Sequence, residues 1–452
     1  MRQTKRFFFL FLFISVFYTI SCRKDKLKES PVISRNFESG SIGQTERTSD
    51  TSWNLYLADD NDNPALPASW RSWWYVRADH LTVGQTLSFT LKNSGWTYYY
   101  LPVYSYDQTN WLRFEETEVK QNDKLEIVIT KAFARPKVYM ARFYPYGFTD
   151  LQRWLNRVKS HPHFQLLKPG YTQQNYPIYL IKLTDESINV SGKKRVLIHA
   201  RTHPAETPPS FAIEGLVDFL TNGSAEAADC LARFEFYIFP MQNVDGVIAG
   251  NYRSTPQSEN LEVLWKRHPE LPFLLDPDVP AEVKTIHQYA LDLMQDGGPG
   301  LSVALNLHAS NSMPDTRTFF FPHFGPLSAA YTTDEAALWD KQIRFIAAFT
   351  THAGQALVEP PPAEGGRGFV QNAFPESWWW INYNEHVMAM TLEMTYGRAG
   401  YAPLWVAPPD MRLTGKALAR AIRDYFDSSL HYNMVNTAAK TNLPITEEES
   451  KQ

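Results

Sequence analysis

The segment RTHPAETPPS, residues 201–210, places His203 and Glu206 three residues apart. An imidazole nitrogen and a carboxylate oxygen at this spacing can bind one metal ion, and zinc accepts this mixture of ligands. The same spacing also occurs where a polar turn begins a helix, so the pair alone does not establish a metal site. The apolar run RVLIHA precedes the pair, and both side chains therefore follow a predicted strand.

A second apolar run, LSVALNLHAS, continues through Leu307 and reaches His308 at the end of a predicted strand. A buried imidazole needs a polar partner, which is either a backbone carbonyl or a metal ion. Two histidines and one glutamate match the ligand set of hydrolytic zinc sites, which keep one position open for water. His199 lies on the same predicted strand as His203 but roughly 13 Å from it, so we leave it out of the set.

The apolar strand VMAMTLEM contains a single carboxylate, Glu393, near its end. A lone charge in such a strand is costly unless it belongs to a functional site or to a buried ion pair with an arginine. The helical His-Glu-x-x-His motif is absent from the sequence, so the base is not supplied from beside the ligands. We predict that Glu393 accepts a proton from the attacking water and passes it to the leaving amine.

The elements that must position these residues begin near residue 146. From there, strand-like apolar runs alternate with helical periods, as in DLQRWLNRVKSH, RVLIHA and SFAIEGLVDFL. This pattern predicts an α/β domain over 146–432, in which a mixed sheet is covered by helices. Open α/β sheets bind ligands at the carboxyl ends of their strands, and the candidate residues all lie at or near such ends.

Short alternating runs, among them SWWYVRA and TLSFTL, occupy residues 49–145 and predict an antiparallel β-sandwich. Residues 1–22 resemble a bacterial lipoprotein signal peptide that ends at Cys22, with an uncleaved signal anchor or plain secretion as the alternatives. The composition of residues 23–48 predicts a flexible tether, and that of residues 433–452 a disordered tail. We therefore expect an exported protein of the bacterial cell envelope, in the outer membrane or periplasm, attached to the membrane by a lipid on the cysteine.

The charge and cysteine content exclude other classes of function. The 44 basic and 48 acidic side chains leave a net charge of -4, so we expect no nucleic acid partner. Besides Cys22 the chain contains only Cys230, which excludes an intramolecular disulfide framework in the mature chain and predicts a small buried residue there. The sequence does not indicate an oligomeric state.

Taken in order, these motifs resemble the zinc metallocarboxypeptidases of the carboxypeptidase A type, and among them the cytosolic carboxypeptidase branch. HPAET is similar to the family's HPGET-type ligand motif, NVDGVIAGNYR to its NPDGV-x-x-GNYR segment, and TLE to its catalytic glutamate strand. The upstream runs SWWYVRA, SFTLKN, YDQTNWLRF and MARFYPYGFTDLQ are similar to the β-sandwich that precedes the catalytic domain in that branch. The resemblance extends over residues 53–400.

The resemblance implies one zinc ion per chain, bound by His203, Glu206 and His308, with Glu393 as general acid and base. It also implies that Arg253 of GNYR polarises the scissile carbonyl and stabilises the oxyanion. The expected function is zinc-dependent hydrolysis of a peptide or amide bond near the end of a peptide or protein substrate.

The sequence departs from the family at the segment that binds the substrate's terminal carboxylate. The family shows Gly-x-Asp-Leu-Asn-Arg-x-Trp, whereas SENLEVLW places Glu262 at the Asn position and Val263 at the Arg position. Losing this charge-assisted fork weakens carboxylate recognition by a few kcal/mol. If Glu262 faces the pocket, its charge also repels a terminal carboxylate.

Three functions remain open after this departure. In the first, another arginine binds the carboxylate; the candidates are Arg267, Arg317, Arg367 and Arg398. In the second, the substrate has no free carboxylate there, and the protein is an amidase or peptidase of modified peptides. In the third, the chain is a surface protein that binds glycan or peptide without catalysis. We take Asn251, Glu262 and Arg398 as candidate substrate-binding residues.

Overall fold

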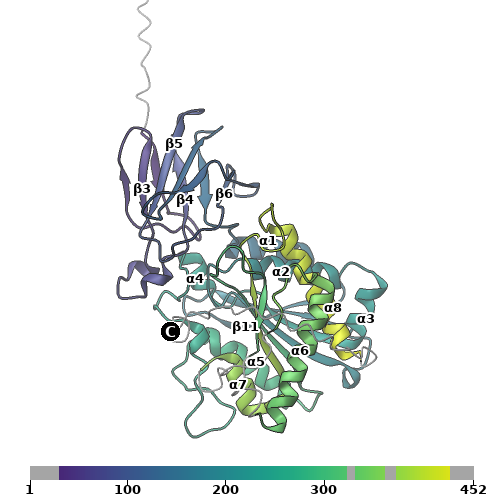
Figure 1. Cartoon of the computed structure of the whole chain (residues 1–452). Helices are drawn as coiled ribbons and strands as arrows, with labels where there is room; N and C mark the ends of the chain where they lie inside the picture. The colour runs from purple at the N-terminus through teal and green to yellow at the C-terminus, as the bar shows by residue number, and fades with distance from the viewer. Residues whose placement is uncertain (1–29, 323–330, 362–372, 428–452) are drawn as a thin grey trace, which may run out of the picture.

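The computed structural model of the chain describes residues 30–322, 331–361 and 373–427. Figure 1 shows a small body of strands, drawn in purple and blue, beside a larger body in which helices surround a sheet. The predicted fold class, a β-sandwich followed by a mixed α/β domain, is confirmed. The predicted lipidated Cys22 and the predicted tail 433–452 lie outside the described residues.

The N-terminal body consists of two five-stranded sheets. The first sheet contains, in spatial order, β1 (Val32–Ser34), β4 (Tyr75–Asp79), β10 (Val138–Ala141), β6 (Val103–Ser105) and β7 (Trp111–Arg113). The second contains β2 (Thr45–Arg47), β3 (Ser52–Tyr56), β5 (Thr86–Lys92), β9 (Ile127–Ala132) and β8 (Val119–Gln121). All pairs are antiparallel except β3 and β5, which run parallel.

The predicted tether over residues 23–48 is wrong from residue 32 onward. Strands β1 and β2 lie within that range and form one edge of each sheet. Each strand has only three residues, VIS and TER, and the surrounding segment is rich in polar residues, so composition suggested a solvated segment. Edge strands of this kind are held by backbone hydrogen bonds and contribute little apolar burial, which is why hydrophobic patterning does not reveal them.

The first sheet of the sandwich packs against the α/β domain. Alternate side chains of a strand point to opposite faces, and Val76 and Met140 accordingly fill the sandwich core. Tyr75 and Tyr139 face the other way and belong to the core that continues into the α/β domain. The two bodies therefore share a continuous apolar interface.

The α/β domain is built on one seven-stranded sheet. Its strands, in spatial order, are β11 (Phe164–Tyr171), β12 (Pro177–Leu183), β14 (Phe234–Phe239), β13 (Lys194–Ala200), β15 (Leu301–Ala309), β17 (Met388–Met394) and β16 (Phe319–Phe321). The four strands from β14 to β17 run parallel, and the outer strands are antiparallel to their neighbours. The parallel strands are apolar and almost fully buried, as expected for strands covered on both faces.

Helices cover both faces of this sheet. The helices are α1 (Phe148–Val158), α2 (Pro208–Leu220), α3 (Ala225–Arg233), α4 (Val244–Ala249), α5 (Ala281–Gln295), α6 (Thr333–Ala353), α7 (Pro375–Tyr383) and α8 (Pro408–Phe426). One core joins the sheet to α2, α6 and α8, and a second core joins its opposite face to α5 and α7. Among the described helices, none combines the length and the apolar character needed to cross a bilayer.

Candidate active site

The predicted ligand residues meet at the carboxyl ends of neighbouring strands. His203 and Glu206 follow β13, and His308 lies in the next strand of the sheet, β15. Leu305 and Leu307 of β15 face the core that contains α2 and α8. Side chains alternate along a strand, so His308 points to the opposite face, where α5 and α7 pack.

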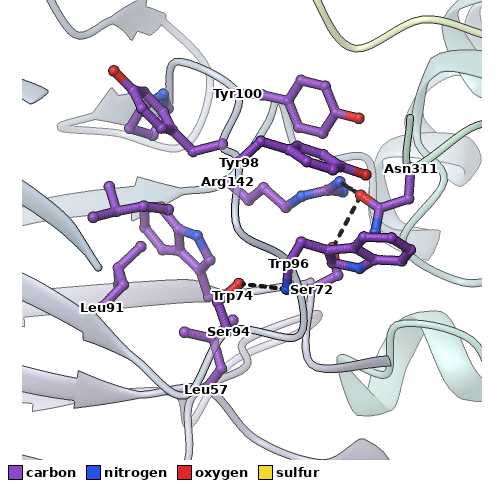
Figure 2. Close-up of a pocket in the computed structure, with 13 residues that line it drawn as sticks. Leu57, Ser72, Trp74, Leu91, Ser94, Trp96, Tyr98, Tyr100, Arg142 and Asn311 are labelled. Carbon is purple, nitrogen blue, oxygen red and sulfur yellow. Dashed lines mark hydrogen bonds between the residues drawn. The ribbon is translucent and has the colours of Figure 1, made fainter. Parts of the chain in front are cut away.

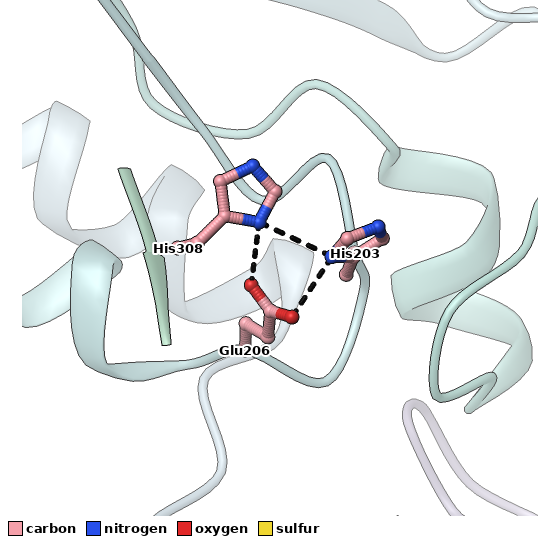
Figure 3. Close-up of side chains that lie close together, drawn as sticks. All are labelled: His203, Glu206 and His308. Carbon is pink, nitrogen blue, oxygen red and sulfur yellow. Dashed lines mark hydrogen bonds and ion pairs between the residues drawn. The ribbon is translucent and has the colours of Figure 1, made fainter. Parts of the chain in front are cut away.

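The three side chains point toward one another, as Figure 3 shows. His203 Nδ1 lies 2.8 Å from Glu206 Oε1, and His308 Nδ1 lies 2.9 Å from Glu206 Oε2. The two Nδ1 atoms are 3.1 Å apart. All three residues are buried, and one ligand atom from each lies within 4.8 Å of the others, so the cluster can bind a metal ion.

The outer nitrogen of each imidazole has its own partner. His203 Nε2 lies 3.1 Å from Asn260 Oδ1, and His308 Nε2 lies 3.2 Å from Glu262 Oε2. Acceptors at both Nε2 atoms favour a proton there, which leaves the two Nδ1 lone pairs and the Glu206 carboxylate facing each other. Three electron-rich atoms this close together repel one another unless a cation lies between them. The donor set therefore fits zinc.

The charges of the site also favour a cation. Burial lowers the pKa of His308, but Glu262 and Glu206 outweigh this effect and raise the pKa well above its usual value. Burial raises the pKa of Glu206, but the two neighbouring histidines dominate and bring it far below the usual range. The pKa of His203 is lowered by burial and then by the charge of Arg253. The Glu206 carboxylate thus stays ionised in a buried site that also contains two histidines.

The loop that carries His203 and Glu206 is held by Arg201. This residue adopts a positive φ of 60°, which is uncommon for a residue with a side chain and requires support from its surroundings. Its buried guanidinium supplies that support by donating to the carbonyl of Pro204 at 3.0 Å and to Ser210 Oγ at 2.8 Å. Ser210 lies in the first turn of α2, so the loop is fixed against that helix.

Glu393 lies next to His308 in the sheet. The two residues are register partners on the parallel strands β15 and β17, which places their side chains on the same face. Glu393 is only partly buried, unlike the neighbouring residues of its strand. Its register therefore places Glu393 beside His308 of the ligand cluster.

Arg253 lies on a loop that the β-sandwich holds in place. Asp60, in the short helix η1 (Asp60–Asp62) of the sandwich, accepts hydrogen bonds from the backbone N–H groups of Tyr252, Arg253 and Ser254 at 2.6, 2.8 and 2.8 Å. The Arg253 guanidinium lies 5.9 Å from the Trp70 ring, also in the sandwich. Its buried Nε has no hydrogen-bond partner among the described residues. The Arg253 side chain is therefore held in position, and its Nε–H remains available as a hydrogen-bond donor.

The three predicted substrate-binding residues all have partners within the protein. Asn251 donates to Asn61 Oδ1 at 2.8 Å and closes the loop before Arg253. Glu262 is buried, and besides His308 it accepts hydrogen bonds from Asn306 Nδ2 at 3.1 and 3.2 Å. Glu262 thus points at His308, one of the three predicted metal ligands. Arg398 is engaged by Asp315 at 2.9 Å on the surface.

The described arginines among those proposed to replace the missing carboxylate clamp are exposed or lie beside surface carboxylates. Arg317 lies 3.9 Å from Glu359, and Arg267 is exposed in the segment after Trp265. Arg367 lies outside the described residues. Val263 occupies the short helix η4 (Leu261–Val263) and brings no charge to the clamp position.

A second buried carboxylate lies near Glu262. Glu376 of α7 accepts a 2.7 Å hydrogen bond from Thr391 of β17. Burial, followed by the charge of Glu262, raises the pKa of Glu376 to about 7. Two carboxyl groups, of Glu262 and Glu376, therefore lie near each other beside the ligand cluster. The family segment would instead supply an arginine at the position that Val263 occupies in SENLEVLW.

Sequence reasoning missed Asp60 and the roles of Asn260 and Asn306. Asp60 lies in the acidic turn LADDNDNP of the other domain, and no spacing within the chain connects it to GNYR. Asn260 belongs to SENLEVLW and occupies the Asp position of the family segment, which offered a usable signal. Asn306 lies two residues before His308 on the same strand face, so strand periodicity could have identified it.

Comparison with known protein families finds two matches along the chain. Residues 33–143 match the family described as cytosolic carboxypeptidase N-terminal domain. Residues 151–269, which contain His203, Glu206 and Arg253, match the family described as zinc carboxypeptidase. Two consecutive segments of the chain are thus similar to carboxypeptidase families. The resemblance inferred from HPAET and GNYR is thereby confirmed.

The chain is also similar to cytosolic carboxypeptidases from animals. Cytosolic carboxypeptidase 6 of Caenorhabditis elegans is 26% identical over 304 residues, which cover 63% of this chain and 63% of that protein. Cytosolic carboxypeptidase 6 of Mus musculus is 28% identical over 298 residues, which cover 61% of this chain and 53% of that protein. The chain thus spans less than two thirds of the length of either relative.

Solved structures share the fold over nearly the whole of their length. A metallo-carboxypeptidase from Burkholderia cenocepacia superposes with a TM-score of 0.73 at 22% identity and covers 88% of this chain and 99% of that one. A metallo-carboxypeptidase from Pseudomonas aeruginosa gives a TM-score of 0.71 at 19% identity with the same coverage. At these identities the likeness establishes the two-domain fold.

Proposed function

We propose that the protein is a zinc-dependent peptidase that hydrolyses a peptide bond near the end of a chain. The observation that carries this proposal is the convergence of His203, Glu206 and His308 on one point, with Glu393 beside them in register. The match of residues 151–269 to the zinc carboxypeptidase family supports the choice of metal and of bond.

His203, Glu206 and His308 would bind the metal ion. When bound, zinc supplies a lowered pKa for the attacking water and a positive charge that polarises the peptide carbonyl. Glu393 accepts the proton of the attacking water and returns it to the leaving nitrogen. Arg253 donates a hydrogen bond to the carbonyl oxygen as negative charge develops on it.

The outer residues keep this arrangement in place. Asn260 and Glu262 orient the two imidazoles through their Nε2 atoms. Asp60 fixes the backbone that carries Arg253, which keeps the guanidinium on the side of the cluster where it affects His203. The β-sandwich therefore helps to position one of the proposed catalytic side chains.

A peptidase of modified peptides is the second candidate, because the side chains of the carboxylate clamp are replaced. Val263 stands at the Arg position, and Glu262 is committed to His308 and Asn306. A substrate with an amidated or otherwise blocked end does not need the missing fork. An envelope location through Cys22 belongs to the proposal as well, and it would direct the activity toward peptides outside the cytoplasm.

Mass spectrometry of a peptide-library digest tests the choice between these substrates. The library contains each peptide with a free and with an amidated C-terminus, and Glu393→Gln protein serves as the inactive control. Removal of terminal residues from free ends supports the carboxypeptidase, and preference for amidated ends supports the second candidate. Equimolar zinc without cleavage of any peptide would contradict both and favour a binding protein.

A further inference from the structure

A small cavity lies where the β-sandwich meets the segment that follows His308. Its volume is about 20 Å³, and the residues that line it include Ser72, Trp96, Tyr98, Arg142 and Asn311 (Figure 2). A cavity of this size holds about one water-sized species and is too small for an amino acid side chain. None of these residues has a role in the proposed hydrolysis.

Arg142 brings an uncompensated positive charge to this cavity. The residue follows β10 and is only 6% exposed. Its guanidinium donates through Nη2 to Asn311 Oδ1 and lies 4.8 and 4.6 Å from the ring centres of Tyr100 and Tyr396. Within the described part of the chain, Nη1 has no hydrogen-bond partner and no carboxylate forms an ion pair with the guanidinium. A buried charge of this kind is costly unless an anion accompanies it.

Two other side-chain nitrogens of the cavity, on Trp96 and Asn311, are also donors, and Tyr98 adds a hydroxyl that can donate as well as accept. Trp96 Nε1 and Asn311 Nδ2 are buried and have no hydrogen-bond partner among the described residues. The orientation of the Asn311 amide is defined, because its Oδ1 accepts from Arg142 and, at 3.3 Å, from Ser72 Oγ. Figure 2 shows the Arg142 guanidinium directed at this amide, with the Trp96 indole near it.

Three N–H donors and one positive charge favour an anion over a water molecule. A water accepts two hydrogen bonds and must place its own two hydrogens on acceptors, whereas an anion accepts from every donor. We propose that the cavity binds a monovalent anion of the size of chloride on Arg142 Nη1, Trp96 Nε1 and Asn311 Nδ2.

The anion would connect the sandwich to the segment after the last metal ligand. Trp96 and Arg142 belong to the sandwich, and Asn311 lies three residues after His308. The same segment is held by Tyr100, whose hydroxyl donates to the carbonyl of Ser312. Anion binding would therefore stabilise the contact between the two domains next to the site.

Crystals of the full chain soaked in bromide test the proposal directly, because bromide replaces chloride and scatters anomalously. We expect an anomalous peak within hydrogen-bonding distance of the three donor atoms. Trp96→Phe keeps the ring but removes one donor, and we expect it to weaken bromide binding by about tenfold. Absence of the peak from wild-type crystals would overturn the proposal.

Asn311→Asp places a carboxylate where the Nδ2 donor lies, so it pairs with Arg142 and excludes the anion. In wild-type protein we expect the unfolding temperature to rise saturably with chloride, compared with gluconate at equal ionic strength, and we expect no such rise in Asn311→Asp. Asn175→Asp, the same charge change on an exposed turn, should behave like wild type. Equal effects of chloride and gluconate on the unfolding temperature of the wild type would contradict a chloride-sized site. So would a bromide peak that is retained in Asn311→Asp, or an unfolding temperature that rises with formate but not with chloride.

Discussion

Asp60 of the β-sandwich accepts a 2.8 Å hydrogen bond from the backbone N–H of Arg253 in the α/β domain. The same carboxylate accepts from Tyr252 and Ser254, so one side chain of the sandwich satisfies three consecutive N–H groups of the loop. The position of the proposed oxyanion donor therefore depends on the N-terminal domain.

Asp60→Asn should reduce turnover without loss of metal. The amide keeps the shape of the side chain but replaces one acceptor oxygen with a donor that faces N–H groups. A hydrogen bond to a charged group contributes about 1.5–3 kcal/mol, so we expect a fall in kcat of roughly tenfold to a hundredfold. Peptide hydrolysis kinetics and zinc content measured on the same sample check this. Asp62→Asn, in the same turn but paired with Arg35 on the surface, is the matched control and should keep wild-type turnover.

Glu262→Gln should weaken zinc binding. Glu262 lies 3.2 Å from His308 Nε2, and acceptors at this position orient the ring and increase its basicity. We expect the zinc affinity to fall by about 10- to 100-fold, measured by competition with a chelator of known affinity. Glu270→Gln, in the exposed segment nearby, should leave the affinity unchanged. An unchanged affinity in Glu262→Gln would rule against an orienting role.

Glu376 should make the stability of the metal-free protein fall as pH rises. Burial, followed by the charge of Glu262, raises the pKa of Glu376 to about 7. The pKa of a glutamate in an unfolded chain is about 4.3. Between these two pKa values the folded chain binds more protons than the unfolded chain. The free energy of unfolding therefore falls as the pH rises from the lower pKa to the higher one. Glu376→Gln cannot ionise and should gain, relative to wild type, on the order of 3 kcal/mol in free energy of unfolding between pH 5 and pH 8.

Urea unfolding of chelator-treated protein at both pH values measures this difference. Glu270→Gln again serves as the control, because it removes a carboxylate from the exposed surface. If the Glu376→Gln and wild-type stabilities change in parallel with pH, the buried carboxyl does not titrate in this range.

Strand ends were the most informative feature of the sequence. The apolar runs before His203 and His308 predicted buried parallel strands, and such strands end at a common edge, so a shared site followed from topology. Glu393 was recognisable as a charge in an otherwise apolar strand, and the register of β15 and β17 places it beside His308. Each of these inferences uses local pattern and one general rule of sheet geometry.

Orientation and partners across domains could not be predicted. The sequence placed Glu262 at the clamp segment, but only the structure shows that its side chain faces His308 and Asn306. Asp60 reaches Arg253 from another domain, and no local pattern encodes such a contact. The short edge strands β1 and β2 were missed because backbone pairing, with little apolar burial, holds them in place.

Hydrolysis of one peptide by wild-type and Glu393→Gln protein, each with its zinc content measured, tests the central claim most directly. Glu393 is the proposed proton carrier and is not among the three ligand residues, so both proteins should bind one zinc ion per chain. We predict that the variant is at least 10²-fold slower in kcat at equal zinc content, the scale of general acid and base catalysis. Equal rates for the two zinc-loaded proteins would contradict the account.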